Sequence, residues 1–354
     1  MSSDSLYINP ERWLRRRRTV ETSKIDQTIQ ACHPQLKPAL EKIHQEPYEV
    51  TTEEQLRNFR ERANGSNAQS VLNEYHAQYS DSHLEHYEWS FNREGYTIDL
   101  SIFRPSGDGP VGGRPCVYYI HGGGFIFGSR WSGMKAIIPL IHDHNAICVT
   151  VEYRLAPEYK APTQLEDCFH GLVEVWKQRD SIGINDRLLL VGRSAGAALA
   201  VGVALRVRDS KDEEKPQICG QILSFPMLDH TSKMASGEFP ESPAWTLHNN
   251  ISAWQWYLGN EKERTTIYSL PGTAGVQDLV GLPPTLIDIA EVDCLCTEAQ
   301  HFGEKLKVAK NDVEIMPWKG LFHCGDWALQ GQQDLYLSEL KFRSVWARRC
   351  LGTS

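Results

Sequence analysis

The sequence has no long apolar run and no excess of positive charge. None of its 354 residues belongs to a stretch that approaches the roughly 18 apolar residues of a membrane-spanning helix, and residues 1–10 are polar where a secretory signal would be apolar. Its 37 lysines and arginines are outnumbered by 45 acidic residues, and the net charge is −8. We therefore expect a cytoplasmic protein with no integral membrane segment and no nucleic-acid partner.

Paired cysteines are also lacking. The nine cysteines are scattered, odd in number and mostly surrounded by apolar residues, which predicts reduced thiols rather than a disulfide framework. Cys294, Cys296 and Cys324 are close together in the last quarter of the chain, but a C-x-C pair with one further cysteine lacks the spacing of a zinc site. We therefore predict buried thiols, no metal and no cofactor. The sequence carries no signal for an oligomeric state.

What the chain does contain is a change of pattern near residue 86. Residues 1–85 are polar, compatible with accessory helices, and carry no catalytic pattern. Their run of arginines from Arg15 to Arg18 is interpreted as a solvated segment without an assigned function. Residues 86–354 carry the signals of a catalytic domain. At about residues 230–265 that domain is interrupted by a polar and then tryptophan-rich stretch, which we interpret as an inserted lid.

Within residues 86–354 the strands are signalled in two ways. Alternating apolar residues from Tyr96 to Ile102, behind a Glu94-Gly95 turn, predict a half-buried antiparallel hairpin. Continuous apolar runs follow at residues 116–120, 146–151, 187–191, 218–225, 285–289 and 313–316. Such runs, separated by helix-length segments, are typical of buried parallel strands with crossover helices. The sequence therefore predicts a mostly parallel, doubly wound α/β sheet with an antiparallel N-terminal start.

A candidate nucleophile lies between the run at residues 187–191 and a helix rich in small residues. Gly192-Arg193-Ser194-Ala195-Gly196 has the G-x-S-x-G pattern of a nucleophile elbow, a sharp strand-to-helix turn that exposes the serine and leaves room only for small residues two positions away. The helix after Ser194 directs its N-terminal amides toward the place where an oxyanion would form. A glycine-rich turn without chemistry is the alternative interpretation.

Three consecutive glycines follow the run at residues 116–120. In His121-Gly122-Gly123-Gly124-Phe125 the backbone amides can approach a charged oxygen, because no side chain intrudes. We predict Gly123, Gly124 and Ala195 as the amide donors of an oxyanion hole, with His121 and Gly122 supporting the loop. A phosphate cradle is disfavoured, because no Lys-Ser or Lys-Thr pair follows and no G-x-G-x-x-G is present.

The candidate acid and base follow the last two apolar runs. A serine nucleophile needs a base to take its proton and an acid to orient that base, in the chain order serine, acid, histidine. Asp293 follows the run at residues 285–289, where sites of open sheets gather. Glu291 is a rival, Asp288 within the strand is a weaker one, and helix capping is the other role open to Asp293. His323, after the last strand, is the candidate base.

Aromatic residues concentrate in the inserted lid. Trp254 and Tyr257 are three positions apart on a predicted helix, and they either attach the lid to the domain or line an acyl pocket. Phe125 and Trp245 are further candidates for that pocket. Such a pocket would take a hydrophobic acyl or alcohol group.

With these residues in place, the chain resembles the hormone-sensitive-lipase-like (HGGG-motif) carboxylesterase family of the α/β-hydrolase superfamily, which is marked by His-Gly-Gly-Gly at the oxyanion loop. The resemblance covers roughly residues 87–345. It includes the segments Tyr153-Arg154-Leu155-Ala156-Pro157-Glu158, Ala161-Pro162, Leu165-Glu166-Asp167 and Phe225-Pro226-Met227-Leu228-Asp229. It implies an α/β-hydrolase fold with a helical cap, to which residues 1–85 and the insertion at about 230–265 both contribute.

The chain departs from that family at the acid and at the base. Family members often carry Asp-Pro-Leu and His-Gly-Phe, whereas this chain has Asp293-Cys294-Leu295 and His323-Cys324-Gly325-Asp326-Trp327. The family also includes plant hormone receptors, but the complete set of Ser194, Asp293 and His323 favours an enzyme. We predict a serine hydrolase that cleaves a carboxylic ester of a small hydrophobic molecule through an acyl-enzyme. A lactone, thioester or amide substrate and a non-catalytic small-molecule binder are the alternatives.

Overall fold

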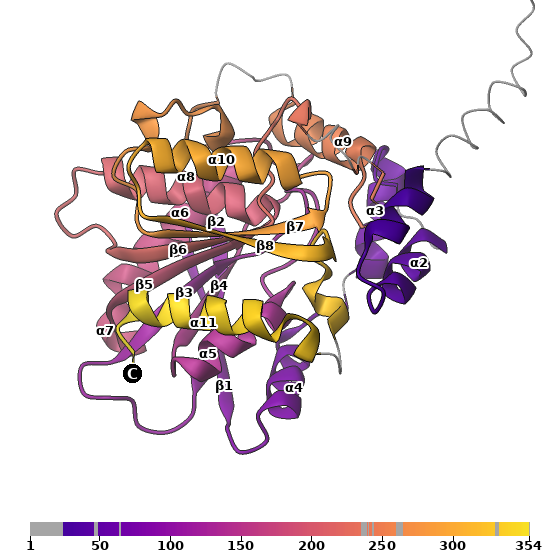
Figure 1. The fold of residues 1–354 in the computed structure, drawn as a ribbon. Coiled ribbons are helices and arrows are strands. Elements are labelled where there is room, and N and C mark those ends of the chain that lie inside the picture. Colours follow the sequence, from indigo (N-terminus) through magenta and orange to yellow (C-terminus); the bar gives the residue numbers. More distant parts are fainter. Residues whose placement is uncertain are drawn as a thin grey trace, which may run out of the picture.

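Figure 1 shows the fold of the chain in a computed structural model. The structure describes residues 24–45, 49–63, 65–234, 239, 241–242, 244–259, 265–329 and 333–353. The run from Arg15 to Arg18 lies outside the described residues, so its interpretation as a solvated segment stays a prediction. In the part that is described, helices cover both faces of a central sheet (Figure 1).

The described residues contain an eight-stranded sheet with the order β1-β2-β4-β3-β5-β6-β7-β8. β2 pairs antiparallel with β1 and with β4, and every pair from β4 to β8 is parallel. The strands are β1 (Leu84–Arg93), β2 (Tyr96–Pro105), β3 (Arg114–Ile120), β4 (Ile147–Glu152), β5 (Ile184–Arg193), β6 (Ile218–Ser224), β7 (Thr285–Val292) and β8 (Val313–Phe322). The predicted mostly parallel sheet with an antiparallel start is confirmed.

Burial explains why the two sequence patterns differ. β3 is buried along its whole length between two layers of helices, so its sequence is continuously apolar. β1 lies at an edge of the sheet and exposes several of its side chains. β8, at the opposite edge, continues through Pro317 to Phe322, beyond the predicted residues 313–316. An edge strand tolerates proline because the missing N–H can face away from the neighbouring strand.

The helices divide between the two faces of the sheet. α6 (Thr163–Lys177), α8 (Ala195–Asp209) and α10 (Cys296–Val308) lie on one face, and α5 (Ile138–Asp143) and α11 (Leu337–Leu351) lie on the other (Figure 1). The shorter elements are α7 (Arg179–Ile182) and the 3₁₀ turns η1 (Met134–Ala136), η4 (Pro271–Thr273), η5 (Gln277–Leu279), η6 (Gly325–Leu329) and η7 (Gln333–Tyr336). α8 is built mainly of alanine, glycine and valine, which lets its backbone come close to β5 and β6.

The N-terminal helices separate into two groups. α2 (Lys37–Gln45) and α3 (Glu53–Ala63) lie on the same side of the molecule as α9 (Leu247–Leu258), the helix of the predicted insertion (Figure 1). The N–H of Val50 donates to the side-chain oxygen of Asn249 at 3.0 Å, which ties this group to α9. α4 (Ala68–Gln78) instead packs against β1 and η1, where it buries two side chains. Of the predicted cap segment, residues 68–78 therefore belong to the body of the molecule.

Candidate active site

Four strands bring the candidate residues to one edge of the sheet. His121, Ser194, Asp293 and His323 are each the first residue after a strand, namely β3, β5, β7 and β8. Because these strands run parallel, their carboxyl ends lie at the same edge, where the sites of open α/β sheets form. Ser194 and His323, which are 129 positions apart in the chain, come into contact there.

Ser194 lies on a strained turn between β5 and α8. Its φ of 51° and ψ of −120° are unusual for a residue with a side chain, and strain of this kind is found at functional sites. A Cβ on Gly192 would overlap the carbonyl oxygen of Gly196, and a Cβ on Gly196 would overlap the carbonyl oxygens of Ile120 and His121. Both glycines of the G-x-S-x-G pattern are therefore required by the close approach of backbone segments around Ser194.

Ser194, His323 and Asp293 form a continuous hydrogen-bonded chain. Oγ of Ser194 is 3.0 Å from Nε2 of His323, and Nδ1 of His323 is 2.6 Å from Oδ2 of Asp293. A carboxylate can only accept, so Nδ1 carries the hydrogen and Nε2 is left to accept from the serine hydroxyl. Oδ1 of Asp293 accepts the N–H of Leu295 at 3.0 Å. The carboxylate therefore orients His323 and also caps the turn that precedes α10.

Burial and a neighbouring charge shift the pKa of His323 in opposite directions. Removal from water by itself would lower the pKa of the imidazole, but the Asp293 carboxylate stabilises the imidazolium, and the pKa is held well above its ordinary value. Asp293 itself is buried next to the ring. His323 can therefore hold a proton that it takes from Ser194, which is the property that a general base needs.

The two rival carboxylates are engaged elsewhere. Glu291 accepts the N–H of Gly320 at 3.2 Å, so it braces the β7–β8 pair. Asp288 is completely buried within β7. It accepts from Oγ of Ser224 at 2.8 Å and from Nη2 of Arg343 at 2.9 Å, which links β6, β7 and α11 under the site. Of the three carboxylates that the sequence left open, Asp293 is the one in contact with the candidate base.

The loop after β3 exposes glycine backbone next to the elbow. Gly123 and Gly124 have φ values of 112° and 58°, and both line the cavity described below. A Cβ on Gly123 would overlap the carbonyl oxygen of Phe127, and one on Gly124 would lie 2.6 Å from the ring of Trp245. Ala195 is the first residue of α8, so its N–H has no acceptor within the helix. These three residues stay our candidates for the oxyanion hole.

His121 packs beneath this loop. Its ring stacks on Tyr153 with the centroids 4.1 Å apart, and its Nδ1 is 2.7 Å from the carbonyl oxygen of Gly122. Burial lowers the pKa of His121 to about 4, so the ring is neutral at neutral pH and Nδ1–H donates to the Gly122 oxygen. We therefore keep His121 and Gly122 as supports of the loop and not as proton carriers.

Ser194 and His323 border a cavity of about 430 Å³. Its lining comprises Ile43, Tyr119, Gly122, Gly123, Gly124, Phe127, Gly128, Ser132, Gly133, Arg193, Ser194, Ala244, Trp245, His323 and Cys324. The Trp245 ring lies 6.3 Å from the His323 ring and 6.2 Å from the Phe127 ring, centroid to centroid. One wall of the cavity is therefore aromatic, and it is built partly from the insertion.

Phe125, Trp254 and Tyr257 do not line that cavity, which corrects their prediction as pocket residues. All three are buried, and the Phe125 ring is 4.0 Å from the Tyr257 ring and 5.0 Å from the Trp254 ring. Trp254 and Tyr257 share the face of α9 that packs on the body of the molecule. Of the two alternatives left open by their spacing, attachment of the insertion is therefore the one observed.

Some cavity residues were missed by the sequence reasoning. Phe127 and Tyr119 lie within three residues of the predicted oxyanion loop, so their positions could have indicated them. Arg193 is the variable residue of the G-x-S-x-G pattern, and nothing in the sequence indicates that its guanidinium pairs with Asp326. Cys324 directly follows the base, and its Sγ is 3.6 Å from Nε2 of His323.

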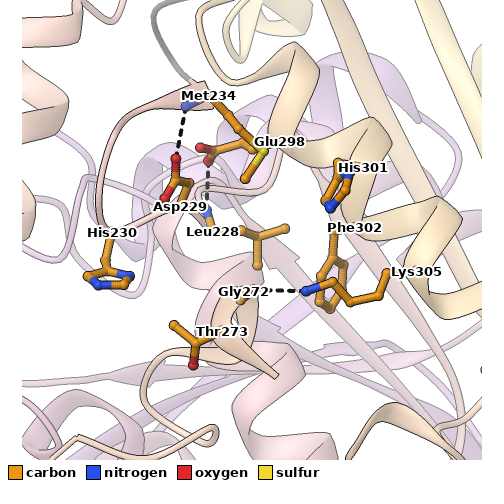
Figure 2. Close-up of a pocket in the computed structure, with 10 residues that line it drawn as sticks. All are labelled: Leu228, Asp229, His230, Met234, Gly272, Thr273, Glu298, His301, Phe302 and Lys305. Carbon is orange, nitrogen blue, oxygen red and sulfur yellow. Dashed lines mark hydrogen bonds between the residues drawn. The ribbon is translucent and has the colours of Figure 1, made fainter. Parts of the chain in front are cut away.

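A smaller cavity of about 70 Å³ lies between α10 and the loop after β6. Figure 2 shows Oε1 of Glu298 accepting the N–H of Leu228, at 2.7 Å, and Asp229 accepting the N–H of Met234, at 2.9 Å. Burial raises the pKa of Glu298 to about 8. The residues that line this cavity do not include the candidate triad, so it is separate from the candidate active site.

Among the residues that the structure describes, no three His, Cys, Asp or Glu side chains are grouped so that they could hold a metal ion. Within the same ranges, no helix has both the length and the apolar character that crossing a membrane requires. All nine cysteines fall in these ranges and are free thiols.

The fold is that of an α/β hydrolase, and Ser194 lies on the sharp turn between β5 and α8. A family model described as alpha/beta hydrolase fold matches residues 117–325, which is more than half of the chain. The chain belongs to this family, and the predicted resemblance to the hormone-sensitive-lipase-like carboxylesterases is confirmed. The predicted α/β-hydrolase fold is confirmed as well.

Curated relatives and solved structures place the chain among esterases. An AB hydrolase superfamily protein of Schizosaccharomyces pombe is 30% identical over 236 residues, 64% of this chain and 67% of its own. The esterase LipI of Mycobacterium tuberculosis is 30% identical over 64% of this chain and 73% of its own. A bacterial heroin esterase superposes with a TM-score of 0.75 at 26% identity, covering 92% of this chain and 99% of its own. The esterase LipW of Mycobacterium marinum superposes with a TM-score of 0.78 at 25% identity, covering 91% of this chain and 96% of its own. The predicted enzyme class, a carboxylic ester hydrolase, is confirmed.

Proposed function

We propose that the chain is a serine esterase that cleaves a carboxylic ester of a small hydrophobic molecule through an acyl-enzyme. The observation that carries the proposal is the line of contacts from Oγ of Ser194 through His323 to Asp293, 3.0 and 2.6 Å long, at the wall of a cavity of about 430 Å³. The aromatic wall formed by Phe127 and Trp245 supports a hydrophobic group on the acyl or alcohol side.

The first half of the reaction acylates Ser194. Oγ attacks the ester carbonyl while Nε2 of His323 takes the hydroxyl proton, and Asp293 stabilises the imidazolium that forms. The carbonyl oxygen becomes an oxyanion, which we place against the amides of Gly123, Gly124 and Ala195; each such donor contributes on the order of 3 kcal/mol. When the tetrahedral intermediate collapses, the alkoxy group leaves with the proton returned by His323.

The second half of the reaction releases the acid. A water molecule attacks the acyl-enzyme carbonyl as Nε2 of His323 takes one of its protons, and the same amides hold the second oxyanion. Collapse breaks the bond between the acyl carbon and Oγ, and His323 returns the proton to Ser194. The carboxylic acid then leaves the cavity.

A fluorophosphonate tests the proposal directly, because it phosphonylates only an activated serine. Intact-mass analysis of the exposed protein, followed by peptide mapping, should give one adduct, on Ser194. Ser194→Ala should give none, while Ser210→Ala, which changes a serine at the other end of α8, should be labelled like the native protein. A folded native protein that carries no adduct would overturn the esterase proposal.

The acyl bond can be assigned by comparing substrates with a shared acyl chain. A lactone, a thioester and an amide can react through the same triad, so they are the alternative substrates. The apolar wall does not select between these bonds, and the names of the similar proteins favour the ester. Among one ester, one lactone, one thioester and one amide, the ester should be hydrolysed fastest. If one of the other three compounds reacts faster, the substrate class would be reassigned to that compound.

The activity should rise with pH as His323 loses its proton. Its pKa is held above its ordinary value of 6.5 by Asp293, and only the neutral ring can accept from Ser194, so log kcat/KM should climb through a midpoint above 6.5. Glu298, with a pKa of about 8, also titrates in this region. Glu298→Gln should leave the midpoint in place; a midpoint that moves with Glu298 would assign the transition to that residue instead.

We also propose that α2, α3 and the insertion act together as a cap on residues 86–354. Ile43 from α2 and both Ala244 and Trp245 from the insertion line the cavity, and Val50 is hydrogen-bonded to α9. A cap of this kind sets the shape of the substrate pocket.

The nine free thiols support the cytoplasmic location that the sequence predicts.

A further inference from the structure

A buried ion pair lies directly beside the candidate nucleophile. Nη1 of Arg193 is 2.6 Å from Oδ2 of Asp326, and Nη2 is 2.7 Å from Oδ1, so the guanidinium and the carboxylate meet in two parallel hydrogen bonds. The two residues are only 5% and 8% exposed. Burial opposes the charge on Asp326, but the adjacent guanidinium outweighs it and holds the pKa of Asp326 below its ordinary value. Both partners are therefore charged.

The pair joins the two loops that carry the nucleophile and the base. Arg193 is the last residue of β5 and precedes Ser194, while Asp326 lies in η6, three positions after His323. Nη2 of Arg193 also approaches the carbonyl oxygen of Cys324 at 3.5 Å. One guanidinium thus holds two points of the turn that follows the base, and Cys324 in that turn has a φ of 53°.

The energetics of such pairs indicate a role other than simple stability. Withdrawing two charges from water costs about as much as their attraction returns, so a buried pair adds little net stability compared with apolar residues of similar size. What the bidentate contact does supply is a fixed geometry. Asp326 also cancels the positive charge of Arg193, which would otherwise disfavour the imidazolium of His323 during the reaction.

We propose that Arg193 and Asp326 are positioning residues that fix the distance between Oγ of Ser194 and Nε2 of His323 by tying the turn after β8 to the nucleophile elbow. The inference rests on the proposed esterase function. The pair does not touch the reacting atoms, and it acts by limiting the positions that His323 can take. A displacement of about 1 Å in such a contact lowers a catalytic rate by roughly 100-fold.

Two variants separate positioning from stability. In Arg193→Met with Asp326→Leu both charges are removed together, so no buried charge is left unpaired and the fold should be retained. We expect kcat and the rate of fluorophosphonate labelling to fall about 10- to 100-fold with little change in KM.

Arg193→Lys keeps the charge but can hold only one point of the turn. Its kcat should lie between those of the native protein and the double variant, with a melting temperature close to native.

A second Arg–Asp pair provides the matched control. Arg154 and Asp167 also meet in two hydrogen bonds, 2.9 and 2.7 Å long, but neither lines the active-site cavity. By the same reasoning Arg154→Met with Asp167→Leu should keep the fold, and it should leave kcat unchanged because the pair is outside the active-site cavity.

Four outcomes of these experiments are decisive. A double variant of Arg193 and Asp326 that keeps native kcat and native labelling would overturn the inference, and so would an equal loss of kcat in the control pair. If the double variant does not fold, native kcat in Arg193→Lys overturns it. A native protein that is never labelled would instead overturn the proposed function itself.

Discussion

Replacing Asp293 by asparagine should lower kcat about 10⁴-fold and leave KM almost unchanged. In the native protein Oδ1 of Asp293 accepts the N–H of Leu295 at 3.0 Å, and Oδ2 lies 2.6 Å from Nδ1 of His323. In the variant the amide oxygen would keep the contact with Leu295, so the amide nitrogen would face His323 and donate to Nδ1. The hydrogen of the neutral imidazole would then lie on Nε2, which could no longer accept the proton of Ser194.

Steady-state kinetics with a chromogenic ester measures this loss, and circular dichroism shows that the variant is folded. Glu291→Gln is the matched control, because Glu291 lies next to the last residue of β7, two positions before Asp293. Its side chain accepts the N–H of Gly320 at 3.2 Å, and a glutamine oxygen can accept the same N–H. We expect this control to keep near-native kcat. Full activity in Asp293→Asn together with a large loss in Glu291→Gln would assign the acid to Glu291.

The order of the candidate residues along the chain could be predicted because each of them follows a predicted strand. Continuous apolar runs mark strands that helices cover on both faces, and the runs before Ser194 and Asp293 correspond to β5 and β7. The elbow was the clearest case, because Gly192 and Gly196 are both required by backbone contacts. The choice among Asp288, Glu291 and Asp293 needed the structure, since these carboxylates lie close together in the chain and the contacts that distinguish them are with distant residues.

The rest of the site depends on contacts between segments that are distant in the chain. Arg193 and Asp326 are 133 positions apart, and no spacing rule links them. The helical spacing of Trp254 and Tyr257 predicts a shared face, but it does not predict whether that face meets a cavity or another element. The same holds for α4: the sequence predicts accessory helices in residues 1–85, and only the fold shows that α4 packs on β1.

Ser194→Ala and His323→Ala should each lower kcat by about 10⁶-fold, and the double variant should be no worse than either single variant. The two side chains act as one unit: the hydroxyl is a poor nucleophile without the base, and the base has no proton to take without the hydroxyl. Their contact of 3.0 Å is the structural basis of this dependence. Initial rates at saturating ester, corrected for the spontaneous reaction, measure all three variants.

The residual activity of the double variant is informative as well. If the loop of Gly123 and Gly124 holds the oxyanion, hydrolysis should still exceed the spontaneous rate by about 10³- to 10⁴-fold. His301→Ala, which changes an exposed histidine on α10, should retain native kcat and serves as the control for histidine loss. Strictly multiplicative losses in the double variant would mean that Ser194 and His323 act independently, and the triad would then have to be abandoned in spite of its geometry.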